Sequence, residues 1–596
     1  MMFRSSALSR TLIVTGGALL CLLGDFPAFG EEKPADKEPP LDKELATSAA
    51  PLVDSLNLTD ARKQRLLRDL QALHAGAKGA VWPAELTTQL SSPDGLKAVA
   101  EMLGSHGFLP AELAWLEKVP QETPDLHTSI VVLHARQLLQ DGPANFDGLW
   151  PKWNDGDTPG TTPNAAKAER ADLATHAANA KGDVIEVLNA FVPKSLVYQL
   201  LQKNFAATAG NIEKLRAEFI PIPEIKEGSA IKPGDSYVGA PVLAQRLAEE
   251  GYLTPGQPAA AEPSAAPAPS TEKKADEKKP ESSAAGPIYT VEMSEAVKRF
   301  QEHHGRTADG IVGPNTLSEL NRDPDDQLAL LRINLHRSRL LPDELGGRYV
   351  MVNIPSAQVL VFTGSEKPEV MMKAIVGAEV KDRQTPVFRD IMERVEFGPY
   401  WNVPPSIAKK EILPKVRKDR SYLERNNYEI VTAYEGGKAQ AVNDGTLSQV
   451  ESGKMFIRQK PGPKNALGSV KFLFPNDFSI YLHDTPDDQL FVEAERGFSH
   501  GCIRVEDPAA LAEIVLGTQG WDRARVETAL QTTEMHKVVI ENPLNVYIVY
   551  FTAFPNWDPS DPRPVRFHPD IYGRDKELLA SVEKKSANDV APAKPE

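Results

Sequence analysis

Two periodicities of apolar residues divide the chain. Over residues 46–229 apolar residues recur every three or four positions, as in LTDARKQRLLRDLQAL, where Leu66, Leu67, Leu70 and Leu73 share one face. This spacing matches the 3.6-residue turn of an amphipathic helix and predicts a helical scaffold domain. No group of chemically reactive side chains gathers in this region, so we expect it to support the rest of the molecule.

From Arg348 onward the period changes to two. RYVMVNI, AQVLVFTG and VMMKAIVG alternate apolar and polar residues, and further strands are expected at VKFLFP, FSIYLHD, HKVVIE and NVYIVYFTAF. Such alternation predicts an antiparallel β-rich domain over residues 348–553. Residues 405–462 break the pattern and predict a helical capping insert. The fold class is therefore multidomain α+β.

Two amphipathic segments flank a stretch rich in proline, alanine and charge at residues 254–287, which predicts a flexible linker. KPGDSYVGAPVLAQRLAEEGYL precedes this stretch, and YTVEMSEAVKRFQEHHGRTADGIVGPNTLSELN follows it. We expect the two to form one small three-helix domain over residues 230–321. Similar composition predicts a linker at 31–45, and residues 554–581 are expected to be a C-terminal extension before a disordered tail at 582–596.

The first thirty residues resemble a secretory signal peptide. Arg4 and Arg10 precede an apolar run, and Ala28-Phe29-Gly30 supplies a small-x-small cleavage pattern. The chain is therefore expected to be exported, or to be membrane-tethered if the segment is not cleaved. Cys21 follows a leucine, so a lipidated cysteine is not expected.

Charge and cysteine content narrow the chemistry further. The formal net charge of −15 argues against sequence-independent nucleic-acid binding, and no nucleic-acid partner is expected. No ligand pattern predicts a metal or another cofactor. After removal of the signal segment Cys502 is the single cysteine, so it has no intramolecular disulfide partner. A lone thiol is either a buried bystander or a reactive group.

The surroundings of Cys502 favour reactivity. A thiol needs a base or a positive environment to become a nucleophile. His483 ends the expected strand FSIYLH and is the more plausible base, oriented by a carbonyl of the following turn, while His500 would shape the pocket. Gly501 lets the backbone come close to a substrate, and amide N–H groups there could receive an oxyanion. Arg504 could hold a carboxylate or lower the pKa of the thiol.

Longer strings carry a resemblance to known families. His483-Asp484-Thr485 followed by Ser499-His500-Gly501-Cys502-Ile503-Arg504 resembles the signature of L,D-transpeptidases with a YkuD-type catalytic domain. Three more strings resemble the large YcbB-like subgroup: FGPYWNVPPSIAKKEILPK (397–415), KPGPKNALGSVKFLFPN (460–476) and HPDIYGRD (568–575). The pattern of residues 296–301 and 309–317 resembles a peptidoglycan-binding module.

This resemblance implies a two-step acyl transfer between peptidoglycan tetrapeptide stems, one as donor and one as acceptor, giving 3→3 cross-links through a thioester. It implies that Cys502 is the nucleophile and His483 the proton carrier. His500 and Gly501 would form the inner wall and oxyanion region, and Arg504 matches the last position of the motif. Carbapenems are expected as covalent inhibitors and wall synthases as partners. The resemblance also implies a location in the periplasm, in association with peptidoglycan.

Three further residues are expected at the substrate-binding site: Trp401, Ser499 and Asp484. The resemblance also implies that the backbone carbonyl of Asp484 orients His483. An aromatic residue on a strand is more often part of a core, so Trp401 has that alternative. The basic run from Lys409 to Arg420 would attract anionic stems or form a solvated helix face.

Other functions remain open from sequence. A papain-like or NlpC-type endopeptidase places its cysteine before its histidine, which is the reverse of the order here. Sortases also place the histidine first, but this chain lacks their Thr-Leu-x-Thr-Cys strand. Hydrolysis of the same bond would make an L,D-carboxypeptidase, and a chain without catalysis would be a wall-binding scaffold.

Overall fold

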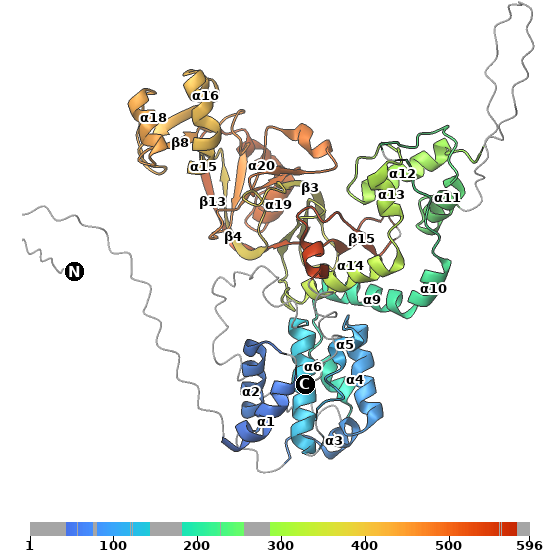
Figure 1. The fold of residues 1–596 in the computed structure, drawn as a ribbon. Coiled ribbons are helices and arrows are strands. Elements are labelled where there is room, and N and C mark those ends of the chain that lie inside the picture. The colour runs from blue at the N-terminus through green and yellow to red at the C-terminus, as the bar shows by residue number, and fades with distance from the viewer. Residues whose placement is uncertain are drawn as a thin grey trace, which may run out of the picture.

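The computed structural model describes residues 43–56, 58–74, 80–119, 121, 123–143, 182–226, 228–254, 286–559, 561 and 563–580. The expected signal segment, residues 31–42 of the first linker, residues 255–285 of the second linker and the tail at 582–596 lie outside the described residues. Helices occupy the N-terminal part, and a large sheet with helices occupies the C-terminal part (Figure 1). The expected multidomain α+β class is confirmed.

The helical domain is built around α6 (Pro124–Asp141), which is buried along most of its length. The other helices are α1 (Lys43–Ser55), α2 (Asp60–His74), α3 (Ala84–Leu90), α4 (Pro93–Ser105), α5 (Pro110–Leu113) and α8 (Val184–Asn189). Leu66, Leu67 and Leu70 of α2 are buried in a common core with Ile130 and Leu139 of α6. The apolar stripe expected from the sequence is therefore the face that α2 packs inward.

The two segments on either side of the second linker form one small domain. α9 (Leu196–Gly210) and α10 (Ile212–Glu218) lead into α11 (Ala240–Glu249), and α12 (Val291–His303) and α13 (Pro314–Leu320) follow the linker. Isolated β-bridges join Ile231 to Val312 and Ser236 to Ile288. Leu243 and Leu247 share a buried core with Val297 and Phe300, so residues separated by the linker fold together.

The large sheet has nine strands in the order β11-β3-β12-β10-β9-β4-β13-β1-β2. Because β3 also pairs with β2, the sheet closes on itself. Three pairs are parallel (β1–β13, β10–β12 and β11–β3), so the sheet is mixed rather than wholly antiparallel. The strands are β1 (Tyr349–Asn353), β2 (Gln358–Phe362), β3 (Val370–Gly377), β4 (Phe388–Phe397), β9 (Val470–Leu473), β10 (Leu482–His483), β11 (Gly497–Ser499), β12 (Ile503–Val505) and β13 (His536–Val549).

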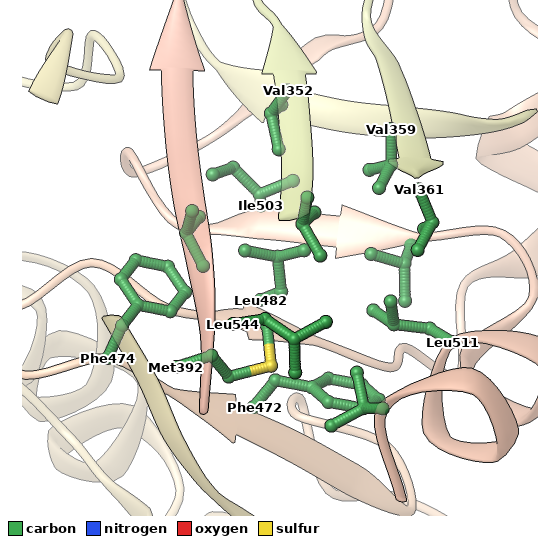
Figure 2. Packing of buried hydrophobic residues seen from close by; sticks show 14 of the residues in the cluster. Val352, Val359, Val361, Met392, Phe472, Phe474, Leu482, Ile503, Leu511 and Leu544 are labelled. Atoms are coloured by element: carbon green, nitrogen blue, oxygen red, sulfur yellow. The ribbon is translucent and has the colours of Figure 1, made fainter. Parts of the chain in front are cut away.

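One side of the closed sheet holds its main apolar core. Val352, Val359, Phe472, Leu482 and Ile503 meet there, together with side chains of the helix α19 (Pro508–Gly517) (Figure 2). The helix α20 (Arg523–Leu530) packs against α19. Successive residues of a strand point to opposite faces. The residues that alternate with this core therefore face outward.

Several strand expectations differ from the structure. The expected strand FSIYLHD begins as a turn, and only Leu482–His483 form β10. β4 was not expected, because charged residues such as Arg389, Glu393 and Arg394 interrupt it. Its buried Met392 and Val395 also lie three positions apart, which breaks a period of two. HKVVIE and NVYIVYFTAF were expected as separate strands, but β13 runs through both, with a register shift between Val539 and Leu544. β14 (Ala553–Pro555) then pairs with β15 (Val565–Phe567) in the C-terminal extension.

The insert contains the expected helices and also a small sheet. Its helices are α15 (Pro405–Ile407), the π-helix η2 (Ala408–Ile412), α16 (Leu413–Lys418), α17 (Tyr422–Arg425) and α18 (Asp444–Glu451). β5 (Trp401–Asn402), β8 (Phe456–Gln459), β6 (Tyr428–Val431) and β7 (Ala439–Gln440) form the sheet in that order. Ile412, Leu413, Val416 and Ile457 are buried together, so the insert has a core of its own.

The helix α14 (Pro324–Ser338) joins the domains. Its Leu331 and Leu335 pack with α9 and with the outer face of β1, β2 and β13. Three arginines near its end make long-range contacts. The guanidinium of Arg332 binds Glu112 at 2.6 Å, that of Arg337 binds Asp575 at 2.5 Å, and that of Arg339 donates to carbonyls of the helical domain. Among the helices of the described residues, none has the length and apolarity needed to cross a membrane.

Candidate active site

Strand pairing brings the expected histidine and cysteine together. β10 runs parallel to β12, with Leu482 opposite Ile503 and His483 opposite Arg504. Leu482 and Ile503 point into the apolar core, so the side chains of His483 and Arg504 point to the outer face. Cys502 directly precedes β12 and is two residues from Arg504, which places its side chain on that same face. His483 and Cys502 are thus diagonal neighbours on adjacent strands.

The thiol of Cys502 is only partly exposed. Its Sγ donates to the carbonyl of Ser479 at 3.7 Å, and Ser479 has a φ of +57°, a left-handed conformation in the turn before β10. Asn476 fixes this turn, because its Oδ1 accepts from the N–H groups of Phe478 and Ile480. Burial raises the pKa of Cys502, while hydrogen bonds with Tyr481 oppose the rise. The resting group is a neutral thiol.

His483 is a neutral imidazole whose tautomer is set by a backbone carbonyl. Its Nδ1 donates to the carbonyl of Asp484 at 2.5 Å, which leaves Nε2 as the acceptor. Burial lowers the pKa of His483 to about 3, helped by the positive charge of Arg504 and opposed by the Asp484 carbonyl. At neutral pH the imidazole is uncharged. In this conformation the thiol of Cys502 donates to Ser479, so a rotation of the thiol toward His483 is required for proton transfer.

A row of charged side chains, with the neutral His483 among them, crosses the outer face at this level. Cross-strand pairing aligns Lys537, Glu396, Lys471, His483 and Arg504, which come from β13, β4, β9, β10 and β12. The Nζ of Lys471 lies 4.1 Å from the centroid of the ring of Tyr481, and Tyr481 is close enough to Cys502 for the two groups to shift each other's pKa. Lys471 and Arg504 both lower the pKa of Cys502 and so favour its thiolate. Arg504 also pairs with Asp487 at 3.4 Å.

Sequence reasoning missed Lys471 and Tyr481. Both lie in strings quoted above, and both have the alternation parity of an outward-facing residue. Their relevance depends on the partners of β9 and β10, which alternation along a single strand does not specify.

The loop before Cys502 is held by its own hydrogen bonds. Gly501 has a φ of +114°, a conformation that favours glycine. Its N–H donates to Ser499 Oγ at 3.0 Å, and the same hydroxyl donates to the Cys502 carbonyl at 2.6 Å. The carbonyl of Gly501 accepts from Thr385 Oγ1 at 2.8 Å. The N–H of Cys502 has no acceptor among the described residues, so it can donate a hydrogen bond to a ligand.

The remaining expected residues surround this centre. Ser499 Oγ is used by the loop, and the carboxylate of Asp484 accepts from the N–H groups of Ser469 and Thr485, so both side chains are committed to the backbone. His500 Nε2 lies 2.7 Å from Glu411 Oε1 of η2, which ties the loop to the insert. Trp401 lies near Tyr481 at the border of the insert; burial raises the pKa of that phenol, and Trp401 opposes the rise. The substrate roles expected for these residues stay predictions.

Half of the basic residues in the run of the insert are paired with acidic residues. Lys410 contacts Asp382 at 3.3 Å, Arg417 contacts Glu451 at 2.6 Å, and Arg420 contacts Asp444. These exposed pairs fit the interpretation as a solvated surface.

A cavity of about 870 Å³ lies beside the site, between the small domain, the sheet and the C-terminal extension. Arg306 and Glu319 line it from the small domain, Gly497 and Phe498 from β11, and Tyr572 from the extension. β11 leads directly into the loop that carries Cys502.

Comparisons with known proteins agree with this arrangement. Residues 347–540 match the family model of the L,D-transpeptidase catalytic domain (YkuD), and residues 282–320 match that of the "Putative peptidoglycan binding domain". The chain therefore carries an L,D-transpeptidase catalytic domain together with a peptidoglycan-binding domain.

A relative named "Putative L,D-transpeptidase", from Haemophilus influenzae, is 31% identical over 256 residues, which are 42% of this chain and 49% of the relative. The chain thus spans about half the length of this curated relative. Two solved structures also match. An L,D-transpeptidase from Xylanimonas cellulosilytica has 13% identity and a TM-score of 0.16, covering 55% of this chain and 100% of the other. A fused Zn-dependent amidase/peptidase/peptidoglycan-binding domain-containing protein from Clostridium acetobutylicum has 12% identity and a TM-score of 0.14, covering 54% and 99%. These TM-scores are too low to define a common fold.

Proposed function

We propose that the chain is a cysteine-dependent L,D-transpeptidase that forms 3→3 cross-links between peptidoglycan stem peptides. One observation carries the proposal: the register of β10 and β12 places the neutral imidazole of His483 and the thiol of Cys502 on one face. The positive charges of Lys471 and Arg504 beside the thiol support it, because they stabilise a thiolate.

In the first step the Cys502 thiol transfers its proton to His483 Nε2, and the sulfur attacks the carbonyl of the third residue of a donor tetrapeptide. The Cys502 N–H receives the negative charge that develops on the carbonyl oxygen. When the C–N bond breaks, His483 returns the proton to the departing amine of D-Ala. The product is a thioester between Cys502 and the stem, with the imidazole neutral again.

In the second step the side-chain amine of a diamino acid on another stem attacks the thioester. His483 takes a proton from this amine and delivers it to the sulfur as the C–S bond breaks. An amide bond between two third residues results, and the thiol is restored. If water replaces the amine, the products are a free tripeptide and the thiol, which is the L,D-carboxypeptidase alternative.

The proposal includes export to the periplasm, retention on peptidoglycan and cooperation with wall synthases. The match of residues 282–320 to a peptidoglycan-binding family supports retention. Deletion of residues 232–321 should lower the fraction of protein that sediments with purified sacculi. Carbapenem acylation of the deleted protein checks that its catalytic domain still folds.

Mass spectrometry tests the catalytic proposal. A carbapenem should add its mass to the intact protein and to His536→Gln, a control at an exposed histidine away from the loop. It should not label Cys502→Ala, and His483→Gln should react about 100-fold or more slowly. Incubation with a disaccharide tetrapeptide should give a cross-linked dimer. A tripeptide alone would mean hydrolysis, and equal labelling of wild type and Cys502→Ala would refute the nucleophile.

A further inference from the structure

The string HPDIYGRD near the C-terminus folds into a fixed, partly buried turn that the chemistry above does not use. Asp570 Oδ1 accepts from Tyr550 OH at 2.6 Å and from the N–H of Arg574 at 2.9 Å. Its Oδ2 accepts from the N–H of Asp575 at 2.8 Å. The carboxylate of Asp575 pairs with Arg337 of α14 at 2.5 Å. The turn is therefore anchored both to the sheet and to the helix that joins the domains.

This turn delivers Tyr572 to the end of β3. The Tyr572 hydroxyl donates to the Gly377 carbonyl at 2.7 Å and accepts from the N–H of Thr385 at 3.1 Å. Its ring stacks on Tyr550, with centroids 5.6 Å apart, and the guanidinium of Arg574 lies 5.1 Å from the Tyr572 ring centroid. Both the position and the hydrogen-bonding direction of the phenol are thus determined.

Thr385 continues the connection to the catalytic loop. It is fully buried, and its Oγ1 accepts from the N–H of Gly377 at 2.8 Å and donates to the Gly501 carbonyl at 2.8 Å. A Cβ on Gly377 would lie 2.1 Å from the Arg383 carbonyl oxygen and 2.5 Å from the Thr385 nitrogen, so β3 and the 383–385 segment approach closely only because residue 377 is glycine. The hydrogen bonds of Tyr572 and Thr385 therefore fix the same backbone, that of Gly377 and the 383–385 segment.

The hydrogen bond from Thr385 affects Cys502 through the peptide group that joins Gly501 to Cys502. The C=O of Gly501 and the N–H of Cys502 belong to one trans peptide and point in opposite directions. Fixing the carbonyl on Thr385 therefore fixes the direction of the N–H that has no acceptor among the described residues. We propose that Tyr572 is a positioning residue, which acts through Thr385 to aim the Cys502 N–H at the oxyanion of the acyl-transfer reaction. This inference rests on the proposed function.

The test compares two reactions of the same sulfur. Acylation by a carbapenem passes through an oxyanion, whereas alkylation by iodoacetamide displaces iodide and forms none. In the full-length protein Tyr572→Phe keeps the ring and removes the hydroxyl. It should lower the maximal rate of carbapenem acylation about tenfold without changing the carbapenem concentration for half-saturation. The rate and pH profile of iodoacetamide alkylation should not change. Tyr547→Phe is the matched control, since its buried hydroxyl also donates to a carbonyl, that of Leu345, at 3.0 Å.

Two Thr385 variants keep the result interpretable. Thr385→Val should lose acylation as Tyr572→Phe does, Thr385→Ser should keep most of it, and the Tyr572→Phe/Thr385→Val double variant should be little worse than Thr385→Val. Unchanged acylation in Tyr572→Phe, equal loss of alkylation and acylation, or multiplicative losses in the double variant would overturn the inference. A wild-type protein that is alkylated at Cys502 but never acylated would instead overturn the proposed function.

Discussion

Replacement of Gly501 by alanine tests whether the backbone beside Cys502 needs glycine. The φ of +114° lies in a region that residues with a Cβ rarely adopt, which costs about 1–3 kcal/mol. An added Cβ would also lie 3.1 Å from Ile480 Cδ1, a side-chain end that can move by a few tenths of an ångström. Backbone strain rather than a steric clash therefore sets the loss in the free energy of unfolding, which is about 2 kcal/mol.

This energy gives two measurable effects. In a domain of this size about 2 kcal/mol lowers the melting temperature by about 4–8 °C. If the loop instead relieves the strain by turning the peptide, the carbonyl leaves Thr385 and the Cys502 N–H changes direction. In that case stability falls less, and the carbapenem acylation rate falls about tenfold or more.

Calorimetry and acylation rates should be measured on the same preparations. Gly517→Ala is the matched control, because Gly517 ends α19 without a positive φ and has nothing within 4 Å of an added Cβ. It should leave acylation unchanged and leave the melting temperature unchanged or slightly higher. The reasoning is refuted if Gly501→Ala melts within about 1 °C of wild type and is acylated at the full rate.

Three further predictions concern charges. Since the positive charge of Lys471 lowers the pKa of Cys502, Lys471→Met should move the midpoint of the rate–pH profile for iodoacetamide alkylation to higher pH, and an unchanged or lower midpoint would contradict this. Glu411→Ala removes the contact with His500, so the carbapenem concentration for half-maximal acylation should rise about two- to fivefold, a modest effect because the pair is partly exposed. Arg339→Met leaves two buried carbonyls of the helical domain without a donor and should cost about 3–5 kcal/mol in urea unfolding; a loss below about 1 kcal/mol would argue against this anchor.

The sequence was most informative where local pattern decides the structure. The face of α2, the strands β1, β2 and β3 and the assembly of the small domain across its linker followed from periodicity alone. His483 was expected to be the base for Cys502, and it ends β10, which pairs with β12 directly after Cys502.

The sequence was least informative where tertiary pairing decides the structure. Lys471 reaches the site because β9 pairs with β10 in one register, and a shift by one residue would turn it into the core. The hydrogen bond from Thr385 to Gly501 joins residues 116 positions apart, and the contact of Tyr572 with Gly377 spans 195. No local preference specifies such contacts, because they form only when the sheet has closed.

The closure of the sheet also limits how the catalytic domain can be isolated. The family match ends at residue 540, but β13 continues to Val549, and its residues 545–549 pair with β1. A fragment cut at 347–540 would leave one side of β1 without hydrogen-bonding partners, and an unpaired strand edge recruits other chains. Such a fragment should aggregate on expression, whereas one that retains β13, β14 and the turn after β15 keeps the sheet closed.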